Sequence, residues 1–291
     1  IESKVHFCDL GGNTKIVDQQ RKLTAEAQEE HVSVVPDCGL APGMVNILAQ
    51  SGIDALDETE SVKIYVGGLP QIPEPPLNYQ LLYSLEGVLD YYTTPVLVLE
   101  DGEVIDKEPL TGRETVTFEA LGELEAFLTA GGISRMPYRY RGLISSMSYK
   151  TLRYPGHCVL MKAMRDLGLM DLKPVEIGGV SVVPRDVLIK ILDAKLRKPS
   201  SKDLVVMRVI TEGFVEGVSR TVTYEMVDYY DQDQEITAMM RTTGYSLAAT
   251  AYMQSAGVIP RGVHTPSECI PAEAYIQQLA ERGIVIERSE T

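Results

Sequence analysis

The first 55 residues of this chain alternate between strand-like and helix-like segments. A short β-type run at residues 5–8 precedes helix formers at 13–30, and a β-branched run at 31–35 precedes helical periodicity at 43–56. This β-α-β-α order is typical of a parallel sheet with helices on its faces. We therefore expect an α/β fold, with part of a Rossmann-like, doubly wound dinucleotide-binding domain over residues 1–58.

The pattern changes near residue 60. Strands are expected at 62–66, 96–99, 175–177, 204–211, 220–228 and 235–240, the last three as an antiparallel meander, and helices at 121–129, 157–167 and 184–196. Residues 59–240 are thus predicted to form an α+β substrate and dimerisation domain with a mixed, largely antiparallel sheet. Helical patterns at 246–255 and 271–282 predict that residues 241–291 return to the Rossmann domain.

The charge and the composition of the chain argue against several classes of function. The formal net charge of -14 disfavours binding to nucleic acid or anionic lipid, and it tolerates a cationic small molecule. The four cysteines are scattered without CxxC spacing, which favours reduced thiols in a cytoplasmic protein over a disulfide framework. No apolar run approaches the roughly 18 residues of a spanning helix. No histidine spacing implies a metal site.

The segment Asp-Cys-Gly-Leu-Ala-Pro-Gly at residues 37–43 lies between a predicted strand and a predicted helix. In open α/β sheets ligands bind where strand ends and helix N-termini converge. Gly39 and Gly43 would permit close backbone approach, although an ordinary turn uses the same residues. Asp9, at the end of the first strand, could hold a ribose hydroxyl or a substrate ammonium, or cap the next helix.

Residues 149–157 concentrate Lys150, Arg153, His157 and two tyrosines. An arginine can clamp a carboxylate, and a histidine or lysine can move a proton. An exposed strand and loop is an equally good reading. No GxGxxG or GxxxxGK[ST] motif is present, so the residues alone indicate a two-domain α/β protein with a small-molecule cleft.

Several segments in order along the chain resemble the saccharopine dehydrogenase-like family, and within it the lysine 6-dehydrogenases. They are VHFCDLGG, PDCGLAPGMVNILA, YVGGLPQIPEPPLNY, YSLEGVLDYYTTP, LEAFLTAGGIS, YKTLRYPGH, MMRTTGYSLAA and RGVHTPSECIPAEAYIQQLAERGI. The resemblance implies a Rossmann domain interrupted by a substrate domain. It also implies that the nucleotide-binding turn of the family precedes Ile1.

The activity implied by the resemblance is NAD- or NADP-dependent oxidation of an amine carbon, with L-lysine deaminated at its ε-carbon to the semialdehyde. The implied substrate-binding residues are Asp37, Gly39, Leu40, Tyr79, Glu86, Thr129 and Arg153, with Arg153 on the carboxylate and Glu86 or Asp9 on an ammonium. The implied cofactor contacts are Asp9, Cys38, Gly39 and Thr243. Lys150 or His157 is expected to transfer the proton.

Two alternative functions remain open from the sequence. The substrate could instead be saccharopine or carboxynorspermidine. A saccharopine site must bind more carboxylates and should therefore need extra Arg or Lys around the cleft. The chain could also be a non-catalytic binding or oligomerisation module. A homodimer or higher homo-oligomer through the middle domain is expected from its exposed sheet edge. The enzyme hypothesis requires that Gly39 and Arg153 face each other across one gap.

Overall fold

A computed structural model describes residues 1–198 and 202–291. A three-stranded parallel sheet brings the start of the chain together with residues 262–263. The strand order is β1-β2-β13, with β1 (Phe7–Cys8), β2 (Ser33–Val35) and β13 (Gly262–Val263). The helix formers after β1 fold as two short helices, α1 (Thr14–Arg21) and α2 (Thr24–Glu29). Asn13 caps α1 by accepting hydrogen bonds from the amides of Lys15 and Ile16.

The larger sheet has nine strands within the described residues. Its main path runs β14-β12-β11-β3-β8-β4-β5, and β7 pairs with both β8 and β6. Only β3 and β8 pair in parallel, so the mixed, largely antiparallel sheet expected from the sequence is confirmed. The strands are β3 (Glu58–Pro70), β4 (Val96–Glu100), β5 (Glu103–Lys107), β6 (Glu114–Phe118), β7 (Gly122–Leu128), β8 (Ser146–Arg153), β11 (Asp203–Val215), β12 (Val218–Tyr229) and β14 (Glu287–Glu290).

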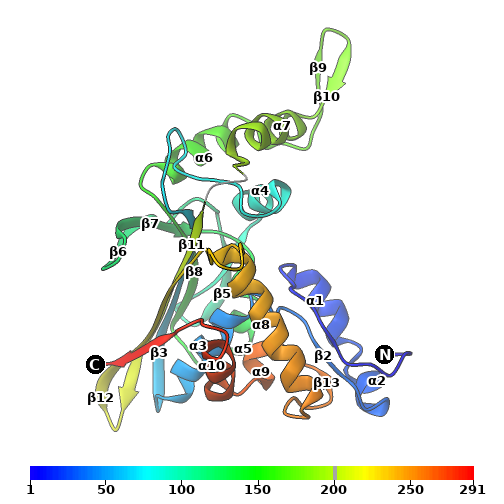
Figure 1. Cartoon of the computed structure of the whole chain (residues 1–291), viewed down its shortest axis with the longest axis vertical. Coiled ribbons are helices and arrows are strands. Elements are labelled where there is room, and N and C mark those ends of the chain that lie inside the picture. The colour runs from blue at the N-terminus through cyan, green and yellow to red at the C-terminus, as the bar shows by residue number, and fades with distance from the viewer. Residues whose placement is uncertain (199–201) are drawn as a thin grey trace.

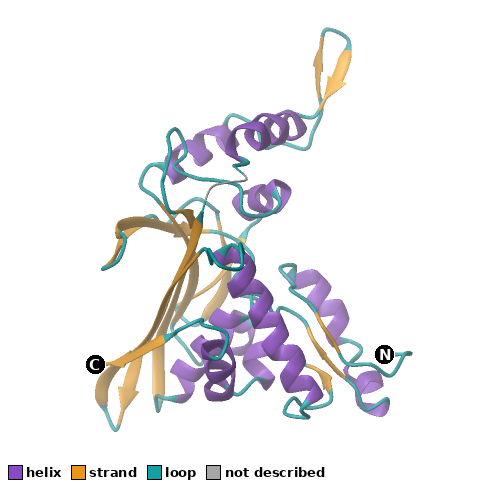
Figure 2. Ribbon diagram, viewed as in Figure 1, coloured by secondary structure: helices purple, strands orange, loops and turns teal. Residues whose placement is uncertain are grey.

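The main hydrophobic core lies between one face of this sheet and three helices, α3 (Met44–Asp54), α8 (Ala238–Ser255) and α10 (Ala272–Ala280). The helices stand together beside the sheet in Figure 2. Helix α8 also contacts β1, and the side-chain amide of Gln254 donates to the carbonyl oxygens of Phe7 and Ser33. This helix therefore joins the two sheets. The short helices α5 (Met136–Arg139) and α9 (Pro266–Cys269) complete this layer.

Two expected elements are wrong. The segment 121–129 is rich in helix formers, but it forms strand β7 because it pairs on both sides, with β6 and β8. The expected strand at 235–240 is not formed, because residues 238–240 are the first turn of α8. Both carboxylate oxygens of the buried Asp203 accept hydrogen bonds from the first amides of α8, those of Ala238 and Met239, at 2.7 and 2.9 Å.

A second core lies beyond the end of the large sheet. There α4 (Leu85–Thr93) contacts α6 (His157–Asp166) and α7 (Pro184–Leu196), and the hairpin of β9 (Val175–Ile177) and β10 (Val180–Val182) extends past them (Figure 1). Helices α6 and α7 and strand β9 agree with the sequence prediction. Among the described residues, no helix combines the length and apolar character needed to cross a membrane.

Candidate functional site

A cavity of about 480 Å³ lies where the small sheet, the large sheet and the N-terminus of α8 meet. Its walls come from parts of the chain that are far apart in sequence. The loops after β1 and β2 form one side, strand β8 and the loop after β7 form another, and the first turns of α8 close the third. The lining residues are Leu10, Gly11, Gly12, Gly39, Leu40, Ala41, Pro42, Val66, Gly68, Leu82, Tyr83, Tyr91, Thr129, Ala130, Gly132, Tyr149, Thr151, Arg153, Met239, Met240, Thr243 and Gly244.

The loop after β2 is held in shape by Asp37, which is 2% exposed. Its carboxylate accepts hydrogen bonds from the Gly12 amide at 3.1 Å and from the Ser134 hydroxyl. Burial raises the pKa of this carboxyl group. The loop is also tight, since a Cβ on Gly43 would lie 2.1 Å from the Gly39 carbonyl oxygen. Asp37 therefore ties the two strand-end loops to the segment after β7.

Arg153 is the charged residue of the cavity wall. Only 4% of it is exposed, and its guanidinium lies over the ring of Tyr79, 4.7 Å from the ring centroid. One terminal nitrogen donates to the Leu152 carbonyl oxygen at 2.8 Å, whereas the buried Nε has no hydrogen-bond partner. Within the described residues no carboxylate is within ion-pair distance of it. A buried cation left in this state favours an anionic ligand.

An aromatic group supports Arg153 from behind. The buried His157 packs edge-on against Tyr79 and stacks on Phe127, at centroid distances of 5.3 and 6.4 Å. One ring nitrogen of His157 bonds the Leu77 carbonyl oxygen at 3.1 Å and the other bonds the Tyr92 hydroxyl at 3.0 Å. Burial, with a smaller effect of the Arg153 charge, lowers the pKa of His157 to about 3. The imidazole is therefore neutral at pH 7, with Nδ1 as donor and Nε2 as acceptor.

The remaining polar wall consists of hydroxyl groups. Thr151 of β8 and Thr129, which directly follows β7, share a hydrogen bond of 2.7 Å between their side-chain oxygens. Tyr83, Tyr91 and Tyr149 also line the cavity. Burial raises the pKa of Tyr91 to about 12, so its hydroxyl stays protonated at neutral pH. These groups can donate hydrogen bonds to a ligand but are not bases near pH 7.

The structure brings five of the predicted site residues to this one cavity: Gly39, Leu40, Thr129, Arg153 and Thr243. Gly39 and Arg153 thus face the same space, as the enzyme hypothesis requires. Tyr79 lies one layer behind, under Arg153, and Asp37 lies behind Gly12. The three tyrosines and Thr151 were not predicted. Period-2 alternation from Arg153 along β8 would have found Tyr149 and Thr151, because all three are on one face.

Both residues expected to transfer the proton lie outside the cavity. Lys150 is on the opposite face of β8 from Arg153, where its ammonium group bonds the Glu114 carboxylate at 2.6 Å. Two side chains an odd number of residues apart along a strand lie on opposite faces of the sheet. Lys150 and Arg153, which are close together in the sequence, are therefore on different faces of β8. His157 is enclosed behind Arg153 by Tyr79, Tyr92 and Phe127, and its lowered pKa makes it a poor base.

Three further predicted contacts also lie elsewhere. Glu86 is in the exposed first turn of α4, where it accepts a hydrogen bond from the Ser84 hydroxyl at 2.8 Å. The Asp9 carboxylate accepts from the Gly11 amide at 2.7 Å and from the Gln20 side chain at 2.6 Å. Cys38 is buried, with its thiol bonded to the Val35 carbonyl oxygen at 3.0 Å. All three side chains make hydrogen bonds to nearby backbone or side-chain groups, and none of them lines the cavity.

Comparison with known proteins bears directly on this arrangement. The model of the saccharopine dehydrogenase C-terminal domain matches residues 39–284, which is most of the chain. The chain belongs to the saccharopine dehydrogenase family. The resemblance of the sequence segments to the saccharopine dehydrogenase-like family is therefore confirmed.

Two curated relatives of this saccharopine dehydrogenase family member have nearly the same identity to it. The mitochondrial alpha-aminoadipic semialdehyde synthase of Rattus norvegicus is 25% identical over 100% of this chain and 39% of its own length. The saccharopine dehydrogenase [NADP(+), L-glutamate-forming] of Saccharomyces cerevisiae is 26% identical over 68% of this chain and 46% of its own length. The chain thus spans less than half the length of these curated relatives.

Solved structures share the fold of the family member. Apo saccharopine dehydrogenase (L-Glu forming) from Saccharomyces cerevisiae aligns with a TM-score of 0.75 at 18% identity, covering 93% of this chain and 77% of its own. The homospermidine synthase of Legionella pneumophila, in complex with NAD, aligns with a TM-score of 0.63 at 11% identity, covering 98% and 71%. The mixed α/β architecture predicted from the sequence is confirmed by both.

Proposed function

We propose that this chain is the substrate-binding part of an NAD(P)-dependent oxidoreductase acting on the amine carbon of an amino acid with one carboxylate, most simply L-lysine at its ε-carbon. The observation that carries the proposal is the state of Arg153. It is the single charged residue that lines the cavity among the described residues, and its Nε has no partner. A carboxylate would supply the missing counter-charge and accept a charge-assisted hydrogen bond.

The rest of the cavity suits the chain of such a substrate. Val66, Leu82, Met239 and Met240 provide apolar contacts, which fit the methylene groups between the carboxylate and the reacting carbon. The threonine and tyrosine hydroxyls supply donors of fixed direction. Holding the carboxylate at one point while the methylene chain packs along the wall would fix the distance of the reacting carbon from Arg153, and such positioning is the main task of the protein in a cofactor-dependent hydride transfer.

The glycine-lined side of the cavity fits the nicotinamide end of the cofactor. Gly11, Gly12 and Gly39 line it at the strand ends, and Gly244 lines it from α8, so flat contact with the backbone is not blocked by side chains. Thr243 adds a hydroxyl beside them. When bound, NAD(P) would accept the hydride. The residues present are therefore compatible with the cofactor that the family resemblance implies.

Proton removal from the substrate ammonium falls to water in this proposal. Lys150 is paired with Glu114 on the far side of β8, and His157 is neutral and enclosed. The tyrosine hydroxyls hold their protons at pH 7, as the raised pKa of Tyr91 shows. The rate at limiting substrate should then follow deprotonation of the free amine rather than a group of the enzyme.

Saccharopine is the second candidate substrate, favoured by the names of the relatives. It carries three carboxylates, whereas the described cavity wall offers one cation. Each additional carboxylate left without a partner in a buried site costs about 1–3 kcal/mol or more, which favours the substrate with a single carboxylate.

The test is an assay of cofactor reduction by the full-length protein with L-lysine and with saccharopine. We expect kcat/KM to be at least about 100-fold higher for lysine, which corresponds to roughly 2.7 kcal/mol. A preference for saccharopine would reject the proposal. Reduction of neither, with NAD(P) binding absent in a fluorescence titration, would favour the non-catalytic module.

A further inference from the structure

The glycine pair Gly67–Gly68 lies in strand β3, at the wall of the cavity. Gly68 lines the cavity together with Val66, two positions earlier on the same face of the strand. The strand is an interior one, paired with β8 on one side and with β11 on the other, where Gly68 lies opposite Val205. A glycine inside such a strand weakens it and often marks a place where another group approaches closely.

The two glycines have different surroundings. A Cβ on Gly67 would lie 2.9 Å from both the Cβ and the carbonyl oxygen of Leu152, which are fixed in β8. A Cβ on Gly68 would lie 2.4 Å from Cε of Met239 and 2.9 Å from Cδ1 of Leu82, the ends of two flexible side chains. Gly67 therefore permits tight packing within the sheet, whereas Gly68 leaves room for side chains that line the cavity.

Arg153 lies beside Gly68 on the same face of the sheet. The parallel register of β3 and β8 pairs Val66 with Thr151, and Gly68 and Arg153 each follow two residues later. All four residues line the cavity. Gly68 does not have a positive φ, so an alanine could adopt its backbone conformation. A side chain at this position is therefore excluded by the neighbouring side chains and not by the backbone.

Met239 is held by the protein on the sides away from the cavity. It is the second residue of α8, and its amide donates to the buried Asp203 carboxylate at 2.9 Å. Its sulfur accepts a hydrogen bond from the Thr243 hydroxyl at 3.7 Å, and its side chain packs against the main core. A methyl group at position 68 would therefore push the end of Met239 into the cavity, where a ligand would lie.

Helix α8 also gives this part of the cavity a length. Met239 lies beside Gly68, and four residues later Cγ2 of Thr243 lies 3.7 Å from the position of a Cβ on Gly39. Four residues of helix rise about 6 Å. With C–C bonds of about 1.5 Å an extended chain advances roughly 1.25 Å per bond, so the five bonds from the carboxylate carbon to the sixth carbon also span about 6 Å. The wall between Gly68 and Gly39 thus has the length of a six-carbon chain.

We propose that Gly68 determines the length of the substrate that the cavity accepts. It lets the ends of Met239 and Leu82 lie against β3, which keeps the cavity open for an unbranched 2-amino acid of six carbons. A larger residue at this position would select shorter chains. Because the carboxylate is assigned to Arg153, this role of Gly68 rests on the proposed function, but the accepted length can be measured by binding alone.

The test is the binding of unbranched 2-amino acids of four to seven carbons that lack the terminal amine. Isothermal titration calorimetry of the full-length protein, in the presence of NAD(P), measures Kd for each acid. In the wild type we expect binding to tighten about fourfold per carbon up to six carbons and to weaken about tenfold at seven. Gly68→Ala should weaken binding of the six-carbon acid about tenfold or more and leave the four-carbon acid within about threefold.

A double variant identifies the cause of the change. On a Met239→Ala background, Gly68→Ala should alter each Kd by less than about threefold, since the displaced side chain is absent. Met239→Ala alone should let the seven-carbon acid bind at least as tightly as the six-carbon acid, and it tests the same wall if Gly68→Ala does not fold. Gly87→Ala is the matched control, because a Cβ there meets nothing within 4 Å, and it should leave every Kd within about twofold.

Circular dichroism and a thermal melt check the folding of each variant. Equal weakening of all four acids by Gly68→Ala would overturn the role of Gly68, as would a wild type that binds them without regard to length or not at all. If the preferred length shifts as expected but the full-length protein does not oxidise lysine, Gly68 keeps its role and the proposed function fails. If lysine is oxidised and Gly68→Ala has no length-dependent effect, only the role of Gly68 fails.

Discussion

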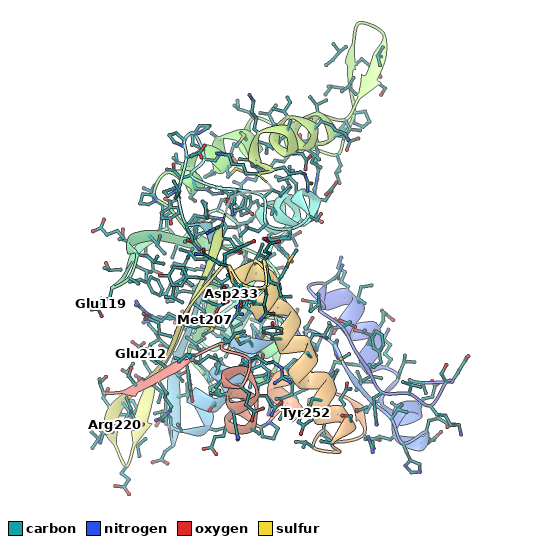
Figure 3. All side chains as sticks on the ribbon, in the orientation of Figure 1. Glu119, Met207, Glu212, Arg220, Asp233 and Tyr252 are labelled. Carbon is teal, nitrogen blue, oxygen red and sulfur yellow. The ribbon has the colours of Figure 1, made fainter. Side chains whose placement is uncertain are left out.

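The two faces of strand β8 hold two cations in opposite situations. Arg153 faces the cavity, 4% exposed, with no carboxylate partner among the described residues. Lys150, three positions earlier, faces the other side of the sheet and pairs with Glu114 at 2.6 Å. On that side of the sheet, away from the helices, Glu212 is visible in Figure 3, and it too is paired, with Lys63 at 2.9 Å.

The difference shows why charge in a sequence cluster is a weak guide to function. A paired and partly solvated lysine needs nothing from a ligand, and its ion pair contributes little to stability. A buried arginine with a donor that makes no hydrogen bond destabilises the folded protein unless a ligand supplies the acceptor. The presence or absence of a carboxylate partner, and not the residue type, distinguishes the candidate ligand-binding cation Arg153 from the structural cation Lys150.

Replacing Arg153 by Ala should produce the largest effect. We expect KM for L-lysine to rise about 100- to 1,000-fold, because removal of one member of a buried charge pair costs roughly 3–4 kcal/mol. The KM for NAD(P) should be nearly unchanged. Steady-state kinetics of the full-length protein measures both, and a KM for lysine within twofold of the wild type would remove Arg153 from the substrate site.

The diamine that lacks the lysine carboxylate provides the internal control for this variant. If Arg153 binds that carboxylate, oxidation of the diamine should be slow in the wild type and hardly slower after Arg153→Ala. An equal loss with both substrates would mean that the substitution damages the cavity generally.

His157, which lies behind Arg153, should make the stability of the protein depend on pH. Its pKa is lowered to about 3, so between pH 7 and pH 5 the unfolded chain takes up a proton that the folded chain does not. Stability is then highest above the ordinary histidine pKa and falls as the pH is lowered, by up to about 2 kcal/mol over this interval. Urea unfolding at both pH values measures the loss.

The variant His157→Gln is the control, since glutamine can keep hydrogen bonds in the site but does not titrate. It should be less stable at pH 7 and should lose most of this pH dependence. A wild type and variant with parallel pH profiles would show that His157 is not held neutral beside Arg153.

Much of the fold could be predicted because it depends on local patterns. The β-α-β-α start, the helices at 157–167 and 184–196, and the meander strands at 204–228 follow from hydrophobic periodicity and turn residues. Strand β7 could not be predicted this way, since its Gly-Glu-Leu-Glu-Ala-Phe-Leu sequence favours a helix and only pairing with β6 and β8 decides otherwise. The start of α8 depends on Asp203, which is 35 residues away from Ala238.

The site was predictable only in part for a similar reason. The glycine loop at 37–43 and Arg153 carry recognisable chemistry, and the fold does bring Gly39 and Arg153 to one cavity. The roles of Lys150, His157 and Glu86 depended on which way each side chain points. Strand alternation explains Lys150, but the enclosure of His157 arises from Tyr79, Tyr92 and Phe127, which come from three separate segments.

Thr129 lines the same cavity as Arg153, and Thr129→Val should have an intermediate effect on KM for lysine. It removes the 2.7 Å hydrogen bond with Thr151 and leaves that buried hydroxyl to find another partner. Because Thr129 also lines the cavity, loss of its hydroxyl should weaken substrate binding by about 1 kcal/mol, seen as a rise of roughly fivefold in KM for lysine with kcat little changed. A fall in kcat without a change in KM would instead assign Thr129 to the reacting end of the substrate.

Lys150→Ala should have the smallest effect, and it tests the other half of the comparison. The ion pair with Glu114 is partly solvated, so its loss should lower stability by no more than about 1 kcal/mol and leave KM and kcat within about twofold of the wild type. The Glu114 carboxylate keeps the Tyr65 hydroxyl, 3.0 Å away, as a donor. A large loss of kcat would reinstate Lys150 as the proton-transfer group. Since the side chain lies on the far face of β8, that result would also require the strand to be turned over relative to Arg153, and the contrast between the two faces would fail with it.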